Sequence, residues 1–267
     1  MTRPRDVAPG VALFPVRTPT LPPATHTNTF AIGREEVLLV EPATPYEDEQ
    51  AAWLAWARSL SGRRIVGVLV THHHVDHASA ATAFARGLGV PLYGHPETFD
   101  RLRDRDAELR PVHEGERLVG SWVALHTPGH APGHLCLHDV EGRTLIAGDM
   151  VANGSTILIP SEDGGDMAEY LAQLRRLDAL DATLMFPAHG EPMDDPHAVF
   201  TYYVKHRLMR EAKVLAAWEK QRGALGREPA LEEIVPLAYD DTPPHLWVIA
   251  RSAAEAHVIK LRREGRV

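Results

Sequence analysis

The sequence predicts an α+β fold, with a strand-rich body followed by a helical C-terminal part. Short apolar runs bounded by Gly and Pro recur through residues 1–190, a pattern that is typical of strands. Longer segments with apolar residues three and four positions apart lie between them and indicate amphipathic helices. From Pro196 the helical spacing is almost continuous. We therefore expect two domains, at residues 1–200 and 201–267.

The individual elements follow from the same patterns. Strands are expected at residues 11–16, 29–32, 36–40, 64–70, 118–125, 135–138, 144–147 and 182–186. Helices are expected at residues 48–60, 78–86, 166–180, 196–222, 228–239 and 242–264. The first helix should face inward with Ala51, Leu54, Ala55 and Leu60, and the helix at 166–180 with Tyr170, Leu171, Leu174 and Leu177.

Composition and charge narrow the class of protein. Of the 267 residues, 44% are hydrophobic and 24% are charged, as in ordinary globular proteins. The formal net charge is −8; residues 201–267 hold 12 Lys and Arg against 9 Asp and Glu, which leaves 16 against 27 for residues 1–200. An acidic body argues against a large nucleic-acid surface. The basic residues Lys260, Arg262, Arg263 and Arg266 are expected to form a solvated helix face, with RNA contact as the alternative.

The cysteine content and the lengths of the apolar runs indicate the cellular compartment of the protein. Cys136 is the only cysteine, so an intrachain disulfide is excluded, and its apolar neighbours predict a buried thiol. No run is long and apolar enough for a membrane span, and residues 1–6 lead into no signal-peptide core. We expect a soluble, cytoplasmic protein with no membrane partner, either a monomer or a homodimer.

The strongest functional signal is the segment Thr71-His72-His73-His74-Val75-Asp76-His77. It follows a predicted buried strand, and the carboxyl ends of such strands are where α/β folds bind ligands. Residues two apart leave a strand on the same side, so His72 and His74 can share one ion, while Asp76 and His77 can reach a neighbouring one. Imidazole and carboxylate suit Zn, Fe or Mn. The alternative is a solvated histidine-rich loop, or histidines hydrogen-bonded in a turn.

Three later segments share one form, in which an apolar strand ends in a turn that carries a His or Asp. They supply His130, Asp149 and His189. A lone His at a turn is more often structural than a ligand. Together with the histidine-rich segment, however, the three complete the donor set of a two-metal site: three imidazoles for one ion, a second mixed set for the other, and a carboxylate between them.

This set resembles the metallo-β-lactamase superfamily, whose signature looks like His72-x-His74-x-Asp76-His77. The resemblance covers residues 1–200 and implies a four-layer αβ/βα sandwich with metal ions at one edge. It implies that metal 1 is held by His72, His74 and His130, that metal 2 is held by Asp76, His77 and His189, and that Asp149 bridges the two. The flavodiiron branch, which binds redox iron, looks to have Glu at position 74, so His74 favours a hydrolase.

More narrowly, the chain resembles β-lactamase-like protein two and its bacterial relatives, and its C-terminal helices resemble their small winged-helix-like domain. Two positions depart from the family's pattern. Glu41-Pro42-Ala43 stands where an Asp-containing, glycine-ended turn is usual, and Ala131 replaces a commoner Thr. We leave His73 out of the site, and we expect His134 to support ligands or the fold without binding metal.

The resemblance implies a binuclear metal-dependent hydrolase. Two ions, expected to be Zn with Fe or Mn as alternatives, would lower the pKa of a shared water from 15.7 toward ~7. The metal-bridging hydroxide would attack an ester, thioester or related acyl bond in a small-molecule substrate, and Asp76 would act catalytically by accepting a hydrogen bond from this nucleophile. The alternative function is a metal-dependent endoribonuclease that cleaves single-stranded RNA.

Three other classes of protein are less favoured. A persulfide-dioxygenase-like iron enzyme gives up second-metal ligands that are present here. An exported β-lactamase normally needs a signal segment, and a non-enzymatic binding protein usually loses metal ligands. Whatever the substrate, we expect the proline-rich loop at residues 18–26 and the segment 161–165 to wall its pocket.

Overall fold

The computed structural model describes residues 3–60 and 62–267, which divide into two compact units. Unit 1 comprises Met1–Thr127, Pro132–Thr156 and Asp181–Pro196, and unit 2 comprises Pro128–Ala131, Ile157–Leu180 and His197–Val267. The domain boundary expected near residue 200 stays a prediction; helix α6 (Pro196–Leu225) passes through that position.

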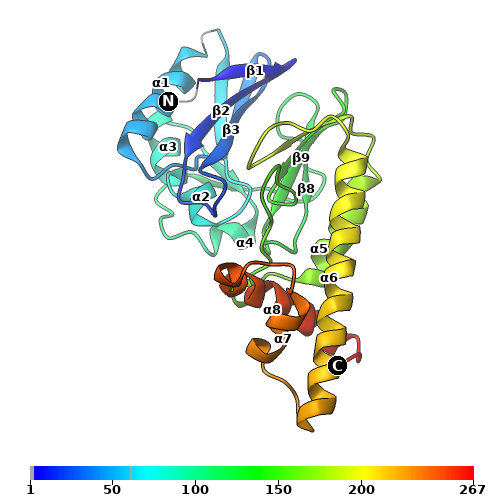
Figure 1. The fold of residues 1–267 in the computed structure, drawn as a ribbon. Helices are drawn as coiled ribbons and strands as arrows, with labels where there is room; N and C mark the ends of the chain where they lie inside the picture. The colour runs from blue at the N-terminus through cyan, green and yellow to red at the C-terminus, as the bar shows by residue number, and fades with distance from the viewer. Residues whose placement is uncertain (1–2, 61) are drawn as a thin grey trace. The chain divides into compact units, whose positions relative to one another are not determined.

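Unit 1 contains two β-sheets (Figure 1). The described strands of the first sheet are paired in chain order: β1 (Arg5–Ala8), β2 (Val11–Arg17), β3 (His26–Gly33), β4 (Glu36–Val40), β5 (Arg64–Leu69), β6 (Leu92–Gly94) and β7 (Leu109–Pro111). The second sheet has the order β11 (Leu184–Pro187), β10 (Thr144–Gly148), β9 (Leu135–Asp139) and β8 (Trp122–His126). Strands β4 and β5 pair in parallel, as do β10 and β11. Each of these pairs therefore ends at one edge of its sheet.

The sheets pack on one another through alternate side chains of their strands. Phe30 of β3 lies against Phe186 of β11, with ring centroids 5.9 Å apart, and Leu13 and Leu137 belong to the same buried cluster. Cys136 is fully buried, as predicted. These contacts make a continuous apolar core that holds the two sheets, and thus their strand ends, in a fixed relation.

Helices α1 (Glu47–Ser59) and α3 (Ala81–Leu88) cover the outer face of the seven-stranded sheet (Figure 1). Trp53 of α1 stacks on Phe84 of α3, with ring centroids 4.1 Å apart. The predicted inward face of α1 is right for Leu54 and Leu60, which are partly buried against the core, and wrong for the two alanines. Trp53, Trp56 and Ala57 are buried, and Ala51 and Ala55 are exposed. The two indole rings bury far more apolar area than alanines would, and they decide which side of the helix packs.

All eight predicted strands are present, although β8 begins later and β11 ends one residue later than expected. Three short strands were not predicted: β1, β6 and β7 have only three or four residues each. The single predicted helix after the histidine-rich segment is two helices, the one-turn α2 (Val75–Ala78) and α3. A further one-turn helix, α4 (Pro96–Phe99), was not predicted.

The regular secondary structure described in unit 2 is all helical, with turns and loops between the helices. The unit contains α5 (Met167–Asp178), nearly all of α6, α7 (Leu231–Ala238), α8 (Trp247–Arg263) and the short 3₁₀ helices η1 (Ser161–Asp163) and η2 (Pro244–Leu246). The predicted inward residues of α5 are all buried. Trp218 of α6, Ile234 of α7 and Ala254 of α8 share one buried cluster. In the described part of the chain, no helix is both long and apolar enough to cross a membrane.

Candidate functional site

Imidazoles and carboxylates gather at the carboxyl ends of four strands of unit 1. We call this group the strand-end cluster; its members are Glu41, His72, His74, Asp76, His77, Asp149 and His189. Each lies directly after β4, β5, β10 or β11 or in the one-turn helix α2. Because β4 and β5 are parallel neighbours, and β10 and β11 likewise, the chain delivers these side chains to one place without long-range loops.

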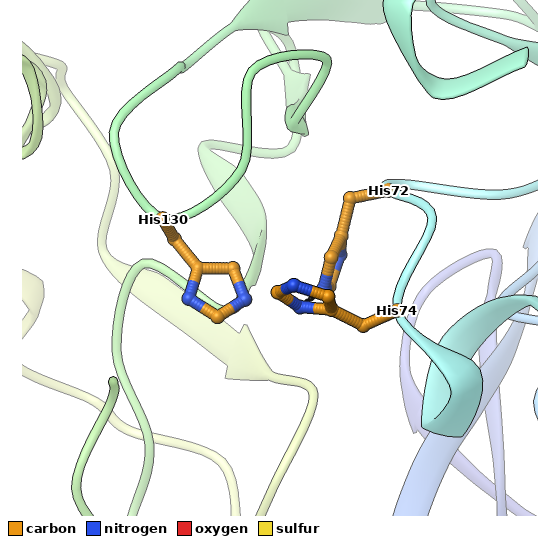
Figure 2. A group of neighbouring side chains, drawn as sticks. All are labelled: His72, His74 and His130. Atoms are coloured by element: carbon orange, nitrogen blue, oxygen red, sulfur yellow. Dashed lines mark hydrogen bonds between the residues drawn. The ribbon is translucent and has the colours of Figure 1, made fainter. Parts of the chain in front are cut away.

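His72 and His74 lie together on the turn after β5 (Figure 2). Nε2 of His72 is 3.0 Å from Nδ1 of His74. Two nitrogens bound to one tetrahedral zinc at 2.0–2.1 Å would be about 3.4 Å apart, so a small adjustment would let the two rings share an ion. Nδ1 of His72 is 3.0 Å from the hydroxyl of Thr71, which fixes the orientation of the buried ring.

Asp76, His77, Asp149 and His189 form the second part of the cluster. Nε2 of His77 is 3.5 Å from Oδ1 of Asp149 and 3.9 Å from Oδ2 of Asp76. Nε2 of His189 is 3.4 Å and 3.6 Å from the same two oxygens. These four side chains thus aim their donor atoms at a common point, just beyond ordinary hydrogen-bond length.

His77 is fully buried among carboxylates. Burial lowers the pKa of His77. The carboxylates of Asp149, Glu41 and Asp76 outweigh burial and raise that pKa well above its usual value. So much negative charge in a buried place favours a positive charge at the centre, whether a proton on His77 or a bound cation.

Glu41 is the member of the cluster that the sequence did not assign. Its Oε2 lies 3.2 Å from Nδ1 of His77, and its Oε1 accepts a hydrogen bond from the Thr71 hydroxyl. It is fully buried and adopts φ 64°, a backbone conformation that non-glycine residues rarely hold without a functional reason. A carboxylate behind a histidine fixes the tautomer that leaves the other ring nitrogen available. Glu41 therefore lies where it can orient His77.

The turn that carries His189 is held by β3. Nδ1 of His189 donates to the carbonyl of His26 at 3.0 Å, which leaves the lone pair of Nε2 facing the carboxylates. The Asn28 amide donates to the carbonyls of Pro187 and Gly190 at 2.9 and 2.8 Å. Asn28 thus holds the backbone before and after His189, so the position of His189 depends on a residue far away in sequence.

His134 supports the cluster from behind, in line with the supporting role expected for it. Its Nδ1 is 2.8 Å from the Thr127 hydroxyl, and its Nε2 accepts a hydrogen bond from the backbone N–H of Asp149 at 3.0 Å. Burial lowers the pKa of His134 to about 3, so the ring stays neutral and can accept that bond. The ring fixes where the Asp149 backbone leaves β10.

His130 lies on the loop 128–131, which belongs to unit 2, and Figure 2 draws it with His72 and His74. Nδ1 of this buried ring donates to the Leu158 carbonyl at 2.7 Å, so Nε2 carries the lone pair. The residues that flank the loop, Thr127 and Pro132, belong to unit 1. His130 stays a predicted ligand. The other six predicted residues all lie in the strand-end cluster, and their role in binding metal is likewise a prediction.

Gly190 should be the glycine beside the cluster that tolerates least. Its φ is 95°, and a Cβ there would lie 2.2 Å from the backbone oxygen of Asn153. We expect Gly190→Ala to lower the free energy of unfolding by about 3 kcal/mol or more, because backbone strain adds to overpacking. The matched control is Gly154→Ala, where φ is 78° and no atom lies within 4 Å, so only about 1 kcal/mol is expected. Equal losses in chemical denaturation would contradict this account.

The geometry agrees with comparisons to known proteins. Residues 22–189 match the model of the metallo-beta-lactamase superfamily, and residues 230–267 match that of the beta-lactamase associated winged helix domain. The chain is 25% identical over 253 residues to a beta-lactamase-like protein 2 homolog of Drosophila melanogaster, covering 90% of this chain and 84% of that protein. It is 27% identical over 215 residues to the atrochrysone carboxyl ACP thioesterase AgnL7 of Paecilomyces divaricatus, covering 77% of this chain and 63% of that one.

Solved structures show the same fold. A beta-lactamase domain protein from Burkholderia ambifaria superposes with a TM-score of 0.83 at 22% identity, over 98% of this chain and 89% of that one. The protein TTHA1623 in a di-iron-bound form superposes with a TM-score of 0.57 at 28% identity, over 69% of this chain and 96% of that one. The body thus has the expected sandwich fold, and the C-terminal part is a winged-helix domain. The chain belongs to the metallo-β-lactamase superfamily of hydrolases.

Proposed function

We propose that the chain is a binuclear metal-dependent hydrolase that cleaves ester, thioester or related acyl bonds. The observation that carries this proposal is the second part of the strand-end cluster, where imidazole nitrogens and carboxylate oxygens converge at 3.4–3.9 Å. Hydrogen bonds between these groups would stabilise the protein little, because the separations are longer than ordinary hydrogen bonds. It has the donor types and the charge that divalent transition metals need.

The surroundings of His77 show whether these residues fit a bound cation. Among the described residues, both ring nitrogens of this fully buried side chain have no hydrogen-bond partner. Leaving a buried donor unsatisfied costs about 1–3 kcal/mol, so a native protein rarely keeps one without a ligand. Nδ1 faces Glu41 and Nε2 faces two further carboxylates, which is the orientation that a carboxylate–histidine–metal arrangement requires. The residues fit a cation at Nε2.

The proposed ligand sets combine the two parts of the strand-end cluster with His130, which lies outside it. We assign the first ion to His72, His74 and His130, and the second to Asp76, His77 and His189, with Asp149 shared between them. Zn is the proposed metal, with Fe or Mn as alternatives, since TTHA1623 holds two irons. When bound, two such ions supply Lewis acidity and lower the pKa of water toward ~7.

The protein's own groups position the reactants. Asp76 would accept a hydrogen bond from the attacking water and orient its lone pair toward the scissile carbonyl. The Asp76 backbone is held for this role, because its carbonyl accepts a hydrogen bond from the Thr27 hydroxyl at 2.8 Å. His134 and Glu41 touch ligands and not substrate, so we regard both as positioning residues.

A cavity next to the turn that carries His189 is our candidate for the acyl substrate, although none of the proposed metal ligands lines it. It has a volume of about 440 Å³, within the range of small-molecule sites, and Gly190 and Asn153 form part of its wall. The last part of the proline-rich loop, from Pro23 to His26, also lines it, whereas the segment 161–165, which was expected to wall the substrate pocket too, does not. The name of AgnL7 includes a thioesterase activity, which favours a thioester among the acyl substrates.

The basic residues of the C-terminal helix give little support to the RNA alternative. Lys260 and Arg266 both pair with Glu211 at 2.8 Å, and Arg262 pairs with Glu228 at 2.6 Å. Arg263 pairs with Asp166. A phosphate backbone would have to displace these carboxylates before it gained any of the four cations. Acyl hydrolysis is therefore the function that we favour.

A parallel activity screen tests the proposal. Purified, metal-loaded protein should hydrolyse acyl thioesters and p-nitrophenyl esters, with two metal ions per chain on the same sample. Its rate should change little between 50 and 200 mM salt, whereas RNA cleavage would fall steeply with salt. A labelled single-stranded RNA is the comparison substrate. RNA cleavage without ester or thioester turnover, or full activity in a metal-free sample, would refute acyl hydrolysis by a paired-metal site.

A further inference from the structure

A second group of metal-binding side chains lies outside the strand-end cluster. We call it the outer histidine cluster; its members are His95, Glu97, His113 and His126. His95 precedes α4, His113 follows β7, and His126 ends β8, so three separate segments of unit 1 contribute. One donor atom from each of His95, Glu97 and His126 lies within 4.8 Å of the others. The ring centroid of the exposed His113 lies 6.1 Å from that of His95, at the edge of this group.

The two central rings are packed as a pair. The His95 and His126 rings are parallel, with an angle of 10° and centroids 4.0 Å apart. Two imidazolium ions could not be held at this distance without strong repulsion, so the pair is stable only when at least one ring is neutral. Burial, and then the charges of His126 and His113, lower the pKa of His95 to about 4. At neutral pH His95 therefore has the neutral imidazole that a transition metal needs.

His126 is fixed in a tautomer suited to metal binding. Its Nε2 lies 2.8 Å from the carbonyl oxygen of Pro132. A carbonyl can only accept, so Nε2 carries the hydrogen and Nδ1 carries the lone pair. A ligating histidine commonly donates its other N–H to a backbone carbonyl in this way. The side chain thus already has the outer contact that orients a ligand.

Helix capping by His95 explains less of this arrangement than metal binding does. The Glu97 N–H donates to Nδ1 of His95 at 3.4 Å, a long helix-capping bond at the start of the one-turn helix α4. An Asn or Ser would cap as well or better. Capping also explains neither the stacked His126 nor the exposed carboxylate of Glu97 beside both rings.

We propose that His95, Glu97 and His126 bind a transition-metal ion, tested here as Zn²⁺, at a site separate from the strand-end cluster. Two imidazoles and a carboxylate are a donor set that zinc accepts once the stacked rings tilt so that both lone pairs meet at the ion, and water completes the coordination. The rings are half-buried and Glu97 is exposed, so this ion exchanges with solvent.

Binding at the outer site would act on the chain that leads to His134. His126 holds the carbonyl of Pro132, and the Thr98 hydroxyl of α4 donates to the next carbonyl, that of Gly133, at 2.9 Å. An ion joining His95 to His126 would tie the start of α4 to the end of β8. Both groups that fix residues 132 and 133 would then be braced together.

Counting zinc in matched variants tests the outer site. Protein is dialysed against a set of zinc-buffered solutions, and bound zinc per chain is measured for wild type, His95→Gln, Glu97→Gln and His138→Gln. His138 is a half-buried histidine of β9 and serves as the control. We expect wild type and His138→Gln to take up one more zinc than His95→Gln, and Glu97→Gln to bind that zinc about tenfold more weakly. Equal uptake by wild type and His95→Gln would overturn the proposal.

A spectroscopic measurement removes the dependence on variant folding. In wild-type protein labelled with ¹⁵N-histidine, zinc added after the tighter sites are filled should shift the ring resonances of His95 and His126 together. Unshifted resonances at saturating zinc would refute the site. The outer site is measured as the difference in bound zinc between wild type and His95→Gln, whatever amount of metal the strand-end cluster holds in both. The outer site can therefore fail while the paired-metal site stands, and the reverse.

Discussion

Asp149→Ala should lower kcat/KM for thioester hydrolysis by about 10³-fold or more and leave fewer than two metal ions per chain. The oxygen of Asp149 faces both His77 and His189 at 3.4–3.5 Å, so its loss removes the only carboxylate proposed to serve both ions. Charge stabilisation by the metal pair is worth several kcal/mol, and each 1.36 kcal/mol is tenfold in rate. His130→Ala should have a similar effect. Steady-state kinetics and metal analysis on the same samples measure both.

Folding and a neighbouring histidine are the controls for these variants. Asp149 follows the end of β10 and does not pack in the core between the sheets, so the circular dichroism spectrum of Asp149→Ala should match that of wild type. His73→Ala should retain nearly full activity, although His73 adjoins two proposed ligands. If Asp149→Ala turns over substrate at close to the wild-type rate, the proposed ligand set is wrong.

Glu41→Gln should reduce metal affinity and activity by about 10–100-fold, the usual result of changing a residue that orients a ligand. The amide keeps the size of the side chain and can still accept from Thr71, but it removes the charge that faces Nδ1 of His77. Glu41→Ala should add a fall in thermal stability, because it leaves the buried Thr71 hydroxyl without the carboxylate that accepts its hydrogen bond. Zinc competition with a chromogenic chelator measures the affinity.

Glu36→Gln is the matched control for Glu41→Gln. Glu36 begins β4, the strand that Glu41 follows; it is exposed and pairs with Arg64. An exposed ion pair contributes about 0–1 kcal/mol, so Glu36→Gln should leave metal affinity unchanged and stability nearly so. Unchanged zinc affinity in Glu41→Gln would show that the carboxylate of Glu41 does not position His77.

The strand ends of the cluster were predictable because their signal is local. Each predicted ligand follows an apolar run and a turn, and parallel strands must end together. Glu41 has the same form, a carboxylate directly after the apolar β4. The same rule, applied to every predicted strand, therefore identifies Glu41 from the sequence.

Other features depend on contacts that no local pattern contains. The strands β6 and β7 have three residues each, too few to display an alternation, and they exist because parallel pairing continues from β5. The outer histidine cluster joins residues 95, 113 and 126, and only the packing of three chain segments brings their rings together. The inward face of α1 depended on which residues reach the sheet, and the tryptophans outweighed the alanine spacing.

The parallel pairing of β10 and β11 has a consequence for how this enzyme could diversify. Between Asp149 and His189 the backbone must return to the opposite end of the sheet before β11 can begin, and a connection of this kind tolerates changes in length and sequence. We therefore expect the exposed parts of residues 150–183, outside the buried face of α5, to be where insertions or replacements could alter substrate preference while β10 and β11 keep their register.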